Sequence, residues 1–581
     1  MTVASPKPKP LASLTAFEQK QLHRAVAQAR KDYDRANHML RTPFASPGYH
    51  TTYKGETVHE TRQSLKFAVA LLDTGRPEDL SDAIDILNQV ISLQDQDSNS
   101  ETYGIWPWFL EESIQEMAPP DWNWADFCGT QLVEARLTHA DRLPTEVLAR
   151  IDESIRHAAN SIQKRNVPIN YTNIVVMGSF VVLMAGEILQ DNKFTRYATE
   201  RLKEFHSFTI KQGTFAEYNS PPYTNVTLNE LRRLQRYTQS PELKERIDTL
   251  YTLAWQEIAE FYHPQTGQWS GPHSRCYETL LTPQIEGNIH RALGMENPDE
   301  VPSLEQHRLS HRCPDSLRHY FTQNSQSLQE PRTLTKIFSQ DPPRIVGTTY
   351  LEPAFSLGSV NYSDLFNQRR SLLAYWGDTK QVRSLRMRFL HDDYDFTAMQ
   401  FYSAQNLGNI LAGIGFATDG GDRHPYFDRL TDGQFEASDL RLRFEAEGVR
   451  IDHTKASQVN CEEGYGIFEL DGLYLSLQMI EAYFGKHRGQ MEITQTSDRY
   501  IIDIVFYSGP RKTFSFPEHG HKQQVAIAFN ASLSSTPDTS APTTASVCYD
   551  SSGWTQYTWN ALEIEVKTTP ASLEYMKRSV E

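Results

Sequence analysis

The sequence predicts an α+β multidomain protein, in which an incomplete α/α toroid is followed by an antiparallel β-sandwich. Three observations lead to this fold class. The chain has 581 residues, whereas a single hydrophobic core rarely grows beyond about 250 to 300 residues. Apolar residues recur at helical spacing in the first half and alternate with polar residues in the second. Hydrophobic residues make up 39% of the chain, which is enough for large cores and excludes generic disorder.

Helical periodicity extends from about residue 14 to 295, and its first stretch covers 16–40. Short loops rich in Pro, Gly and Asn separate the later stretches, which is typical of helical hairpins. The hairpins are too numerous for one four-helix bundle, and no solenoid repeat of about 34 or 40 residues is visible. We therefore expect a ring of hairpins whose loops surround a central cleft.

Strand patterns begin after about residue 340. Runs such as 383–390, 466–480 and 500–507 are β-rich and bounded by polar turns, with no helical crossover between them. Such runs favour antiparallel sheets stacked as a sandwich. We expect three parts: a disordered tail at 1–16, a toroid at 17–330 and a β-domain at 331–581.

The charge balance argues against nucleic-acid and membrane partners. With 57 basic and 73 acidic residues the net charge is −16, and no arginine-rich strip is present. An anionic ligand would need a local positive pocket. The longest apolar run, 174–185, is shorter than the roughly 20 residues of a membrane-spanning helix. Residues 1–16 lack the apolar core of a signal peptide, so both a cytoplasmic location and secretion after signal removal stay open.

No cofactor or metal is expected. The chain has no P-loop, dinucleotide fingerprint, zinc-protease helix or esterase elbow, and its cysteines lack metal or disulfide spacing. Two acidic turns with histidine, 391–395 and 419–424, could hold an ion. Turns are rich in Asp and Gly for backbone reasons alone, so a metal has no part in the expected mechanism.

The loop 213–223, GTFAEYNSPPY, is the first candidate site. Glu217, Tyr218, Asn219 and Tyr223 bring a carboxylate, an amide and two phenols together between two helices. Loops held by a rigid scaffold often carry function. The alternative is a structural corner in which a tyrosine hydroxyl caps backbone groups.

The loop 268–277, QWSGPHSRCY, is the second. His273, Arg275 and Tyr277 alternate, so in an extended loop they share one face. Arg275 would then favour deprotonation of a nearby phenol or bind a carboxylate. The alternative is an arginine bonded to loop carbonyls beside a solvated histidine.

Asn173 and a tryptophan cluster complete the candidates. Asn173 ends VPINYTN at the start of an apolar helix, where an amide either caps the helix or binds an anionic oxygen. The cluster lies in a loop-rich stretch and suits the CH faces of sugar rings, although a core of helical hairpins explains it as well. Its members are Trp106, Trp108, Trp122 and Trp124.

The chain resembles the heparinase II/III-like and alginate-lyase-like polysaccharide lyases. The resemblance rests on a helical toroid followed by a β-domain, with the segments GTFAEYNSPPY and VPINYTNIVV in the helical half. Members carry an Asn, often followed by His, at the start of an inner helix, and later a loop with the catalytic Tyr. Asn173 and Tyr223 match these positions, and Ile174 stands in place of the His. The resemblance implies cleavage of a uronic-acid glycan by β-elimination, with His273 or His391 replacing the missing base.

The elimination needs a base for the C5 proton, a neutralised carboxylate and a proton for the leaving oxygen, and it needs no metal. We assign Tyr223 to the proton, His273 as the alternative or assisting base, and Asn173 with Arg275 to the carboxylate. The expected substrate-binding residues are Glu217, Tyr218, Asn219, Tyr277, Trp106, Trp122, Trp124 and His391.

Two other functions stay open at this point. A glycoside hydrolase on a similar toroid needs a carboxyl pair, which Glu217 with Asp121 or Asp126 would supply. A non-catalytic carbohydrate-binding protein needs only the tryptophans. The sugar, its linkage and the oligomeric state are not indicated.

Overall fold

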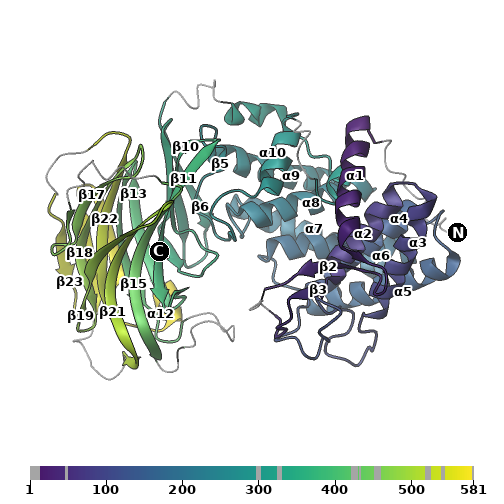
Figure 1. The fold of residues 1–581 in the computed structure, drawn as a ribbon, viewed down its shortest axis with the longest axis horizontal. Helices are drawn as coiled ribbons and strands as arrows, with labels where there is room; N and C mark the ends of the chain where they lie inside the picture. Colours follow the sequence, from purple (N-terminus) through teal and green to yellow (C-terminus); the bar gives the residue numbers. More distant parts are fainter. Residues whose placement is uncertain are drawn as a thin grey trace. The chain divides into compact units, whose positions relative to one another are not determined.

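The computed structural model describes residues 14–45, 50–295, 302–322, 330–420, 430, 433–449, 459–516, 525–537 and 543–578. The chain forms two compact units (Figure 1). Unit 1 comprises Met1–Lys211, Asn225–Ala254 and Pro283–Cys313. Unit 2 comprises Gln212–Thr224, Trp255–Thr282 and Pro314–Glu581. The expected order of a helical half and a β-rich half is confirmed, while the two loops singled out in the sequence belong mainly to the unit that contains the β-sheets.

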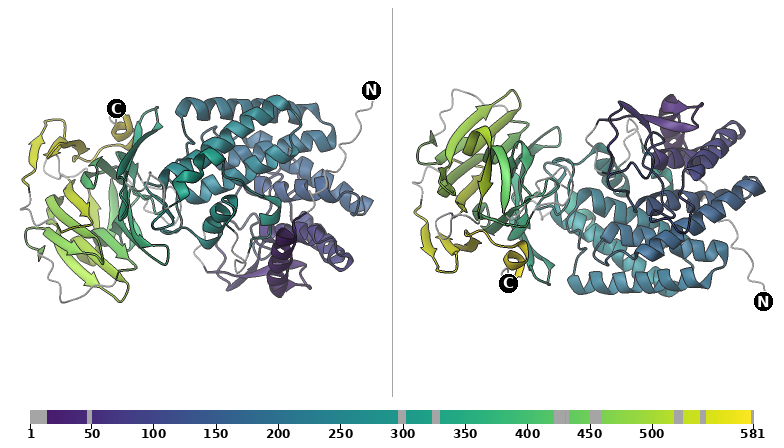
Figure 2. Two further views of the ribbon diagram at one scale, coloured as in Figure 1. Left: turned by 90° about the horizontal axis from the view of Figure 1, so that it is seen from above. Right: turned by 90° about the horizontal axis from the view of Figure 1, so that it is seen from below.

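Helices build the first half, and they follow one another as hairpins in a toroid-like arrangement (Figure 2). Helix α2 packs against α3, α4 packs against α5, and α4 also contacts α2 and α6. The helices are α1 (Ala16–Ala29), α2 (Thr61–Asp73), α3 (Pro77–Ser92), α4 (Trp124–His139), α5 (Thr145–Arg165), α6 (Thr172–Leu189), α7 (Asn192–Gln212), α8 (Pro221–Tyr237), α9 (Pro241–Phe261) and α10 (Pro283–Ala292).

Helix α6 is the apolar core helix of unit 1. By length and composition it could cross a membrane, and it is longer than the apolar run that the sequence suggested. However, 89% of its 18 residues are buried inside the structure. A helix that is apolar on all sides is expected at the centre of a large helical core. Burial among other helices therefore explains its composition.

The expected helix at 16–40 is wrong over its second part. Helix α1 begins at the capping box of Thr15 and Glu18 and ends at Ala29, and a small antiparallel sheet follows. Asp34 accepts a hydrogen bond from the backbone of Ala36, and a turn with positive φ then reverses the chain. These local bonds compete with helix formation. The strands are β1 (Tyr33–Asp34), β2 (Met39–Pro43) and β3 (Thr57–His59).

Unit 1 contains a network of buried ion pairs. Glu305 lies outside the long helices and forms ion pairs with Lys66 of α2 and Arg233 of α8. Gln131 of α4 also donates to it at 2.9 Å. These partners hold the pKa of Glu305 well below its usual range, although burial alone would raise it. The segment that carries Glu305 is thus joined to three helices.

A second centre of the same network is Asp73, at the end of α2. Its carboxylate forms an ion pair with Arg308 and lies 2.9 Å from His139 and 2.7 Å from His307. Arg308 in turn reaches Glu134 of α4 at 3.2 Å. All these groups are buried, so each charge depends on its partner because water cannot replace it.

Most β-strands of unit 2 form two stacked antiparallel sheets (Figure 1), and two smaller sheets, β23-β24-β25 and β4-β5, lie outside them. The strand order in the first sheet is β20-β21-β15-β11-β10-β8-β7-β6, with β12 beside β11. The second sheet has the order β16-β17-β18-β22-β14-β13-β9, with β19 beside β18. One hydrophobic core draws its side chains from both sheets, and Phe444 of the first meets Phe529 of the second at 5.0 Å. The expected sandwich is confirmed.

Strands of both sheets contribute side chains to this core, and a second cluster packs β24 and β25 against β9, β13 and β14. Their bounds are β4 (Tyr262–His263), β5 (Gln268–Trp269), β6 (Arg332–Ser339), β7 (Ile345–Leu351), β8 (Phe355–Val360), β9 (Tyr362–Asp364), β10 (Leu372–Asp378), β11 (Gln381–His391), β12 (Tyr394–Asp395), β13 (Met399–Asn406), β14 (Asn409–Phe416), β15 (Gln434–Glu447), β16 (Val459–Asn460), β17 (Tyr465–Glu469), β18 (Tyr474–Phe484), β19 (His487–Arg488), β20 (Gln490–Gln495), β21 (Arg499–Ser515), β22 (Val525–Ser534), β23 (Ser546–Tyr549), β24 (Trp554–Trp559) and β25 (Leu562–Lys567), and a short helix, α12 (Leu573–Arg578), follows them.

Glu305→Gln should destabilise unit 1 by about 3 to 5 kcal/mol, because it leaves Lys66 and Arg233 as buried charges without their shared carboxylate. Thermal and denaturant unfolding measure this loss. Glu153→Gln is the matched control, since the Glu153 side chain is 56% exposed and surface ion pairs contribute about 1 kcal/mol at most. Equal unfolding curves for the two variants would contradict the role given to the network.

Candidate functional site

The two candidate loops are joined by the side chain of Asn219. This residue is fully buried, and its backbone has a positive φ of 43°, which Asn tolerates better than most residues. Its amide nitrogen donates to the carbonyls of Ser270 at 2.9 Å and Pro272 at 2.7 Å. Its amide oxygen accepts from the indole of Trp269. One side chain therefore fixes the path of the second loop against the first.

The second loop also lies directly on the first sheet of unit 2. Thr349 of β7 donates to the carbonyl of Gly271 at 2.6 Å. A Cβ at Gly358 of β8 would come within 2.0 Å of that carbonyl oxygen, so only glycine allows this approach. His273 and Arg370 exchange backbone hydrogen bonds of 3.2 and 3.0 Å. The backbone of the second loop is thus fixed to the sheet by hydrogen bonds, as that of an added strand would be.

These contacts bring four side chains into one hydrogen-bonded group, which we call the phenol site: Tyr223, Arg275, Tyr277 and Gln368. The hydroxyls of Tyr223 and Tyr277 are 2.6 Å apart. Arg275 donates from Nη2 to the Tyr223 hydroxyl at 3.2 Å and from Nε to Gln368 Oε1 at 2.6 Å. The guanidinium is therefore oriented by an amide on one side and placed against a phenol on the other.

The two phenols of this site have different surroundings. Tyr223 is half-buried, and burial raises its pKa above the ordinary value, while the nearby Arg275 opposes that rise. The Tyr277 side chain is 59% exposed. A molecule arriving from solvent therefore meets Tyr277 first, and Tyr223 lies behind it within hydrogen-bond reach. Such a pair can pass a proton between solvent and a partly desolvated oxygen.

His273 lies close to this group in sequence, but its ring points into the interior. Its Nδ1 donates to the Asn219 carbonyl at 2.7 Å, which leaves the lone pair on Nε2. Burial lowers the pKa of His273 to about 3, so the ring is neutral. Nε2 is buried and bonded to none of the described residues. In this conformation His273 supports Asn219.

Of three other predicted residues of unit 2, Glu217 and His391 are buried and Tyr218 is half-buried. The ring of Tyr218 stacks on Phe338 with centroids 3.9 Å apart, and burial raises its pKa to about 12. Glu217 is 9% exposed. His391, at the end of β11, packs against Phe396 and donates from Nε2 to a backbone carbonyl at 2.7 Å. These positions suit structural support of the loops and of the sheet.

The acidic turns have backbone partners. Asp392 Oδ1 accepts hydrogen bonds from Ser438 N, Ser438 Oγ and Asp439 N. Asp419 accepts from the backbone of Leu573 at 2.6 Å. Asp422 and His424, the other candidates of that turn, lie outside the described residues. Among the residues that the structure describes, no group of His, Cys, Asp and Glu has a metal-binding arrangement.

Asn173 and the tryptophans belong to unit 1. Asn173 is buried at the second position of α6, whose N-cap is Tyr171, so it is not the capping residue itself. Trp106 is fully buried and donates to the carbonyl of Val90 at 2.9 Å, as a core residue does.

The remaining two tryptophans of the prediction are partly accessible. Trp124 stacks on Trp108 with centroids 4.9 Å apart and donates to Thr61 Oγ1 at 2.8 Å. Trp122 donates to the carbonyl of Glu101 at 3.3 Å. The cluster thus comprises a core residue, Trp106, a half-buried stacked pair, Trp108 and Trp124, and Trp122, which is bonded separately to Glu101.

The segment 364–370 was missed in the sequence. It supplies Gln368 to the phenol site, and Arg369 donates to the carbonyl of Ser274 and to Asp364 Oδ1 at 3.0 Å. The backbone of Cys276 donates to the carbonyl of Gln368 at 2.7 Å. The run NQRR after a strand was the one available signal, and such runs are common on solvated surfaces.

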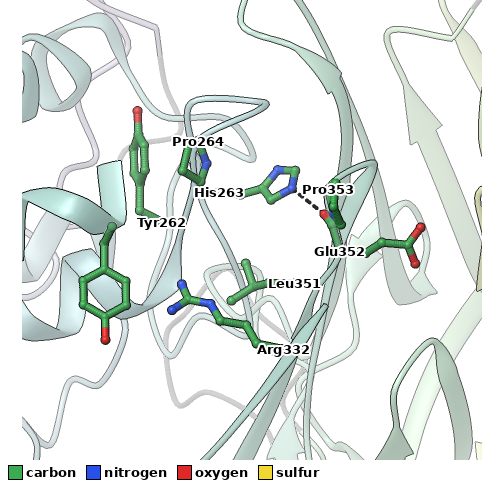
Figure 3. A pocket seen from close by; sticks show the side chains of 8 residues that line it. Tyr262, His263, Pro264, Arg332, Leu351, Glu352 and Pro353 are labelled. Carbon is green, nitrogen blue, oxygen red and sulfur yellow. Dashed lines mark hydrogen bonds between the residues drawn. The ribbon is translucent and has the colours of Figure 1, made fainter. Parts of the chain in front are cut away.

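Figure 3 shows a small pocket of unit 2 that lies beside β4 and has a different lining from the phenol site. His263 closes one side, with Nε2 donating to the carbonyl of Glu352 and Nδ1 bonded to Thr266, both at 2.9 Å. Arg332 lies on the other side. The volume is about 10 Å³, room for roughly one water molecule. Arg332 Nε is buried without a hydrogen-bond partner among the described residues, so the one polar demand at this pocket is of the size that a single water meets.

Comparisons with known proteins give one sequence family and several structures. A model described as a domain of unknown function (DUF8769) matches residues 37–287. No curated protein sequence matches the chain. Heparinase III is similar over 97% of this chain and 93% of its own, with 10% identity and a TM-score of 0.43.

Two further structures are similar over most of their length. The match to the chondroitin AC lyase of Streptomyces coelicolor A3, solved with chondroitin sulphate, covers 95% of this chain and 84% of the lyase. The identity is 10% and the TM-score is 0.46. The match to the heparan sulfate lyase HepC of Pedobacter heparinus covers 97% of this chain and 90% of that lyase, with 9% identity and a TM-score of 0.39. By name, these proteins belong to the polysaccharide lyases, the class that the sequence resembles.

Asn219→Ala should loosen the second loop and lower the stability of unit 2 by several kcal/mol, because two buried carbonyls and one indole lose their partner. Hydrogen exchange over 268–277 and the melting temperature measure both effects. Asn560→Ala is the matched control. Asn560 also has a positive φ, of 53°, but lies exposed in a turn, so it carries the same backbone cost without the buried bonds. Similar exchange in the two variants would contradict the role of the amide.

Proposed function

We propose that this protein is a polysaccharide lyase that cleaves a uronic-acid glycan by β-elimination at the phenol site. The observation that carries the proposal is the position of the Tyr223 hydroxyl. It touches a guanidinium and a second phenol at once, at 3.2 and 2.6 Å. An oxygen between a cation and another hydroxyl is suited to losing and regaining a proton.

The proposed reaction removes the C5 proton of the uronate. The electrons of that C–H bond form a C4=C5 double bond, the C4–O bond breaks, and the leaving oxygen takes a proton. Negative charge develops on the carboxylate beside C5. The protein must therefore provide a base, an acid and a cation, and all three types meet in the phenol site.

In this proposal Tyr223 is the base. Arg275 stabilises the phenolate, and the Tyr277 hydroxyl donates a hydrogen bond to it. The exposed Tyr277 then returns the proton to the leaving oxygen, with Tyr223 resupplying it across their hydrogen bond. Nη1 of Arg275 is bonded to none of the described residues, so this edge of the guanidinium is assigned to the substrate carboxylate.

The other expected roles remain proposals. Asn173 is assigned to the carboxylate together with Arg275, as the sequence resemblance implies. His273 is the alternative base, which would require its Nε2 to become accessible. Glu217, Trp122 and Trp124 stay assigned to the glycan, and the glycan itself is expected to be acidic because Arg275 offers it a cation.

Tyr223→Phe should lower turnover by about 10²- to 10⁴-fold, the usual loss when general acid–base catalysis is removed. It deletes only a hydroxyl, so fold and substrate binding should persist. Ultraviolet absorbance of the unsaturated product, measured on a panel of uronate polymers, is the readout. Tyr394→Phe is the control, because that tyrosine is 58% exposed and lies outside the site.

The same assay separates the alternatives. A hydrolase would release reducing ends without the unsaturated product, and Glu217→Gln would then be inactive while Tyr223→Phe stays active. A non-catalytic binding protein would retain the polymer without cleaving it. Full activity of Tyr223→Phe would exclude the mechanism proposed here.

The pH dependence follows from the raised pKa of Tyr223. A base acts only when deprotonated, so turnover should rise with pH from neutrality into the alkaline range. Arg275→Gln removes the positive charge that opposes the effect of burial, so the rising limb should move to higher pH. The measurement is turnover at saturating substrate between about pH 6 and 10.5. Turnover that falls steadily above neutrality would assign Tyr223 the role of acid instead.

A further inference from the structure

A second cavity lies at one end of the β-sandwich, within unit 2 and apart from the phenol site. It is formed where the turn between β18 and β19 meets the end of β21, and its volume is about 140 Å³. One water needs only about 10 to 15 Å³ by a comparable measure. Its lining consists of Phe484, Gly485, Lys486, His487, Lys512, Thr513, Phe514, Ser515 and Phe516.

The polar part of the lining is positive. Lys512 Nζ lies 3.1 Å from His487 Nε2. Burial lowers the pKa of both groups, and Lys486 lowers each further by its like charge. Within the described ranges, neither lysine is paired with a carboxylate. The lining therefore carries positive charge that no described carboxylate neutralises, which suits an anionic ligand.

The apolar part of the lining is aromatic. Phe484, Phe514 and Phe516 belong to, or pack against, the core between the sheets and present their rings at its end. Lys512 Nζ lies 3.9 Å from the ring centre of Tyr507 and 4.7 Å from that of Phe514. The ammonium is thus held in place by two aromatic faces. A ligand that fits must offer an apolar face beside its charge.

Ser515 adds an unused polar atom to this lining. Its Oγ is buried and has no hydrogen-bond partner among the described residues. A buried hydroxyl without a partner is unfavourable, and a ligand hydroxyl would supply the missing hydrogen bond. Cations, aromatic faces and a free hydroxyl therefore surround the same cavity.

We propose that this cavity binds one acidic sugar residue, a hexuronate, through its carboxylate and one face of its ring. Lys486 and Lys512 take the carboxylate, the phenylalanines take the CH face, and Ser515 takes a ring hydroxyl. This binding is independent of the elimination proposed above, since it uses none of the residues of the phenol site. It would hold an acidic glycan on the β-sandwich whether or not the chain cleaves it.

The test is calorimetric titration of the full chain with D-glucuronate at low salt. All proteins carry Arg275→Gln, so that the phenol site does not contribute and its failure cannot be confused with failure here. We expect one saturable site that weakens about tenfold in Lys486→Gln and at least as much in Lys512→Gln, because each removes a charge-assisted bond. Lys380→Gln, in an exposed turn of the same unit, is the control and should bind as before.

Further ligands and conditions sharpen the result. Methyl β-D-glucopyranoside, which lacks the carboxylate, should bind far more weakly, and raising salt to about 0.5 M should weaken glucuronate because ions screen the lysines. Lys486 is exposed, so Lys486→Gln leaves the fold intact and keeps the test decisive if Lys512→Gln unfolds. The proposal would be overturned if glucuronate did not bind or if Lys486→Gln bound glucuronate as tightly as the protein without that change. It would also be overturned if sulfate bound as tightly as glucuronate.

Discussion

The buried amide of Asn219 is the interaction on which the candidate site depends. It belongs to one loop and binds the other at three points, the carbonyls of Ser270 and Pro272 and the indole of Trp269. Neither loop has enough regular structure to hold a fixed path, since a loop in a protein interior leaves backbone groups without partners. A single primary amide, which both donates and accepts, satisfies them and sets the spacing between the tyrosines.

This fixed spacing also explains the electrostatics of the site. Tyr223 lies in the first turn of α8, whereas Arg275 lies in a loop whose backbone is hydrogen-bonded to Gln368 and Arg370. The guanidinium cannot move away from the phenol to reach solvent, because Gln368 holds its other side. Desolvation and a positive charge therefore act on one oxygen in opposite directions. The balance between burial, which raises the pKa of Tyr223, and the charge of Arg275, which lowers it, sets the pH at which the hydroxyl is deprotonated.

Much of this arrangement was visible in the sequence, because Gly, Pro and polar aromatic residues mark both loops. The alternating spacing predicted a common face for His273, Arg275 and Tyr277. Arg275 and Tyr277 both reach the Tyr223 hydroxyl, whereas His273 points into the interior. Gln368 was invisible, since it comes from a segment 93 residues away from Arg275 and nothing local records that proximity. The burial of His273 was equally hidden. A residue's type states which chemistry it can do, but tertiary packing decides whether its ring meets solvent or a carbonyl.

The interleaving of the two units has a consequence for synthesis. Unit 1 is not finished when its long helices have been made, because Glu305 and Arg308 follow segments that belong to unit 2. Until those residues leave the ribosome, Lys66 lacks Glu305, and Asp73 has only His139 of its three partners. The helical unit therefore completes its ion-pair network only after segments of the other unit have been made. A gene cut between the two architectures would yield two halves that each lack pieces of their own core.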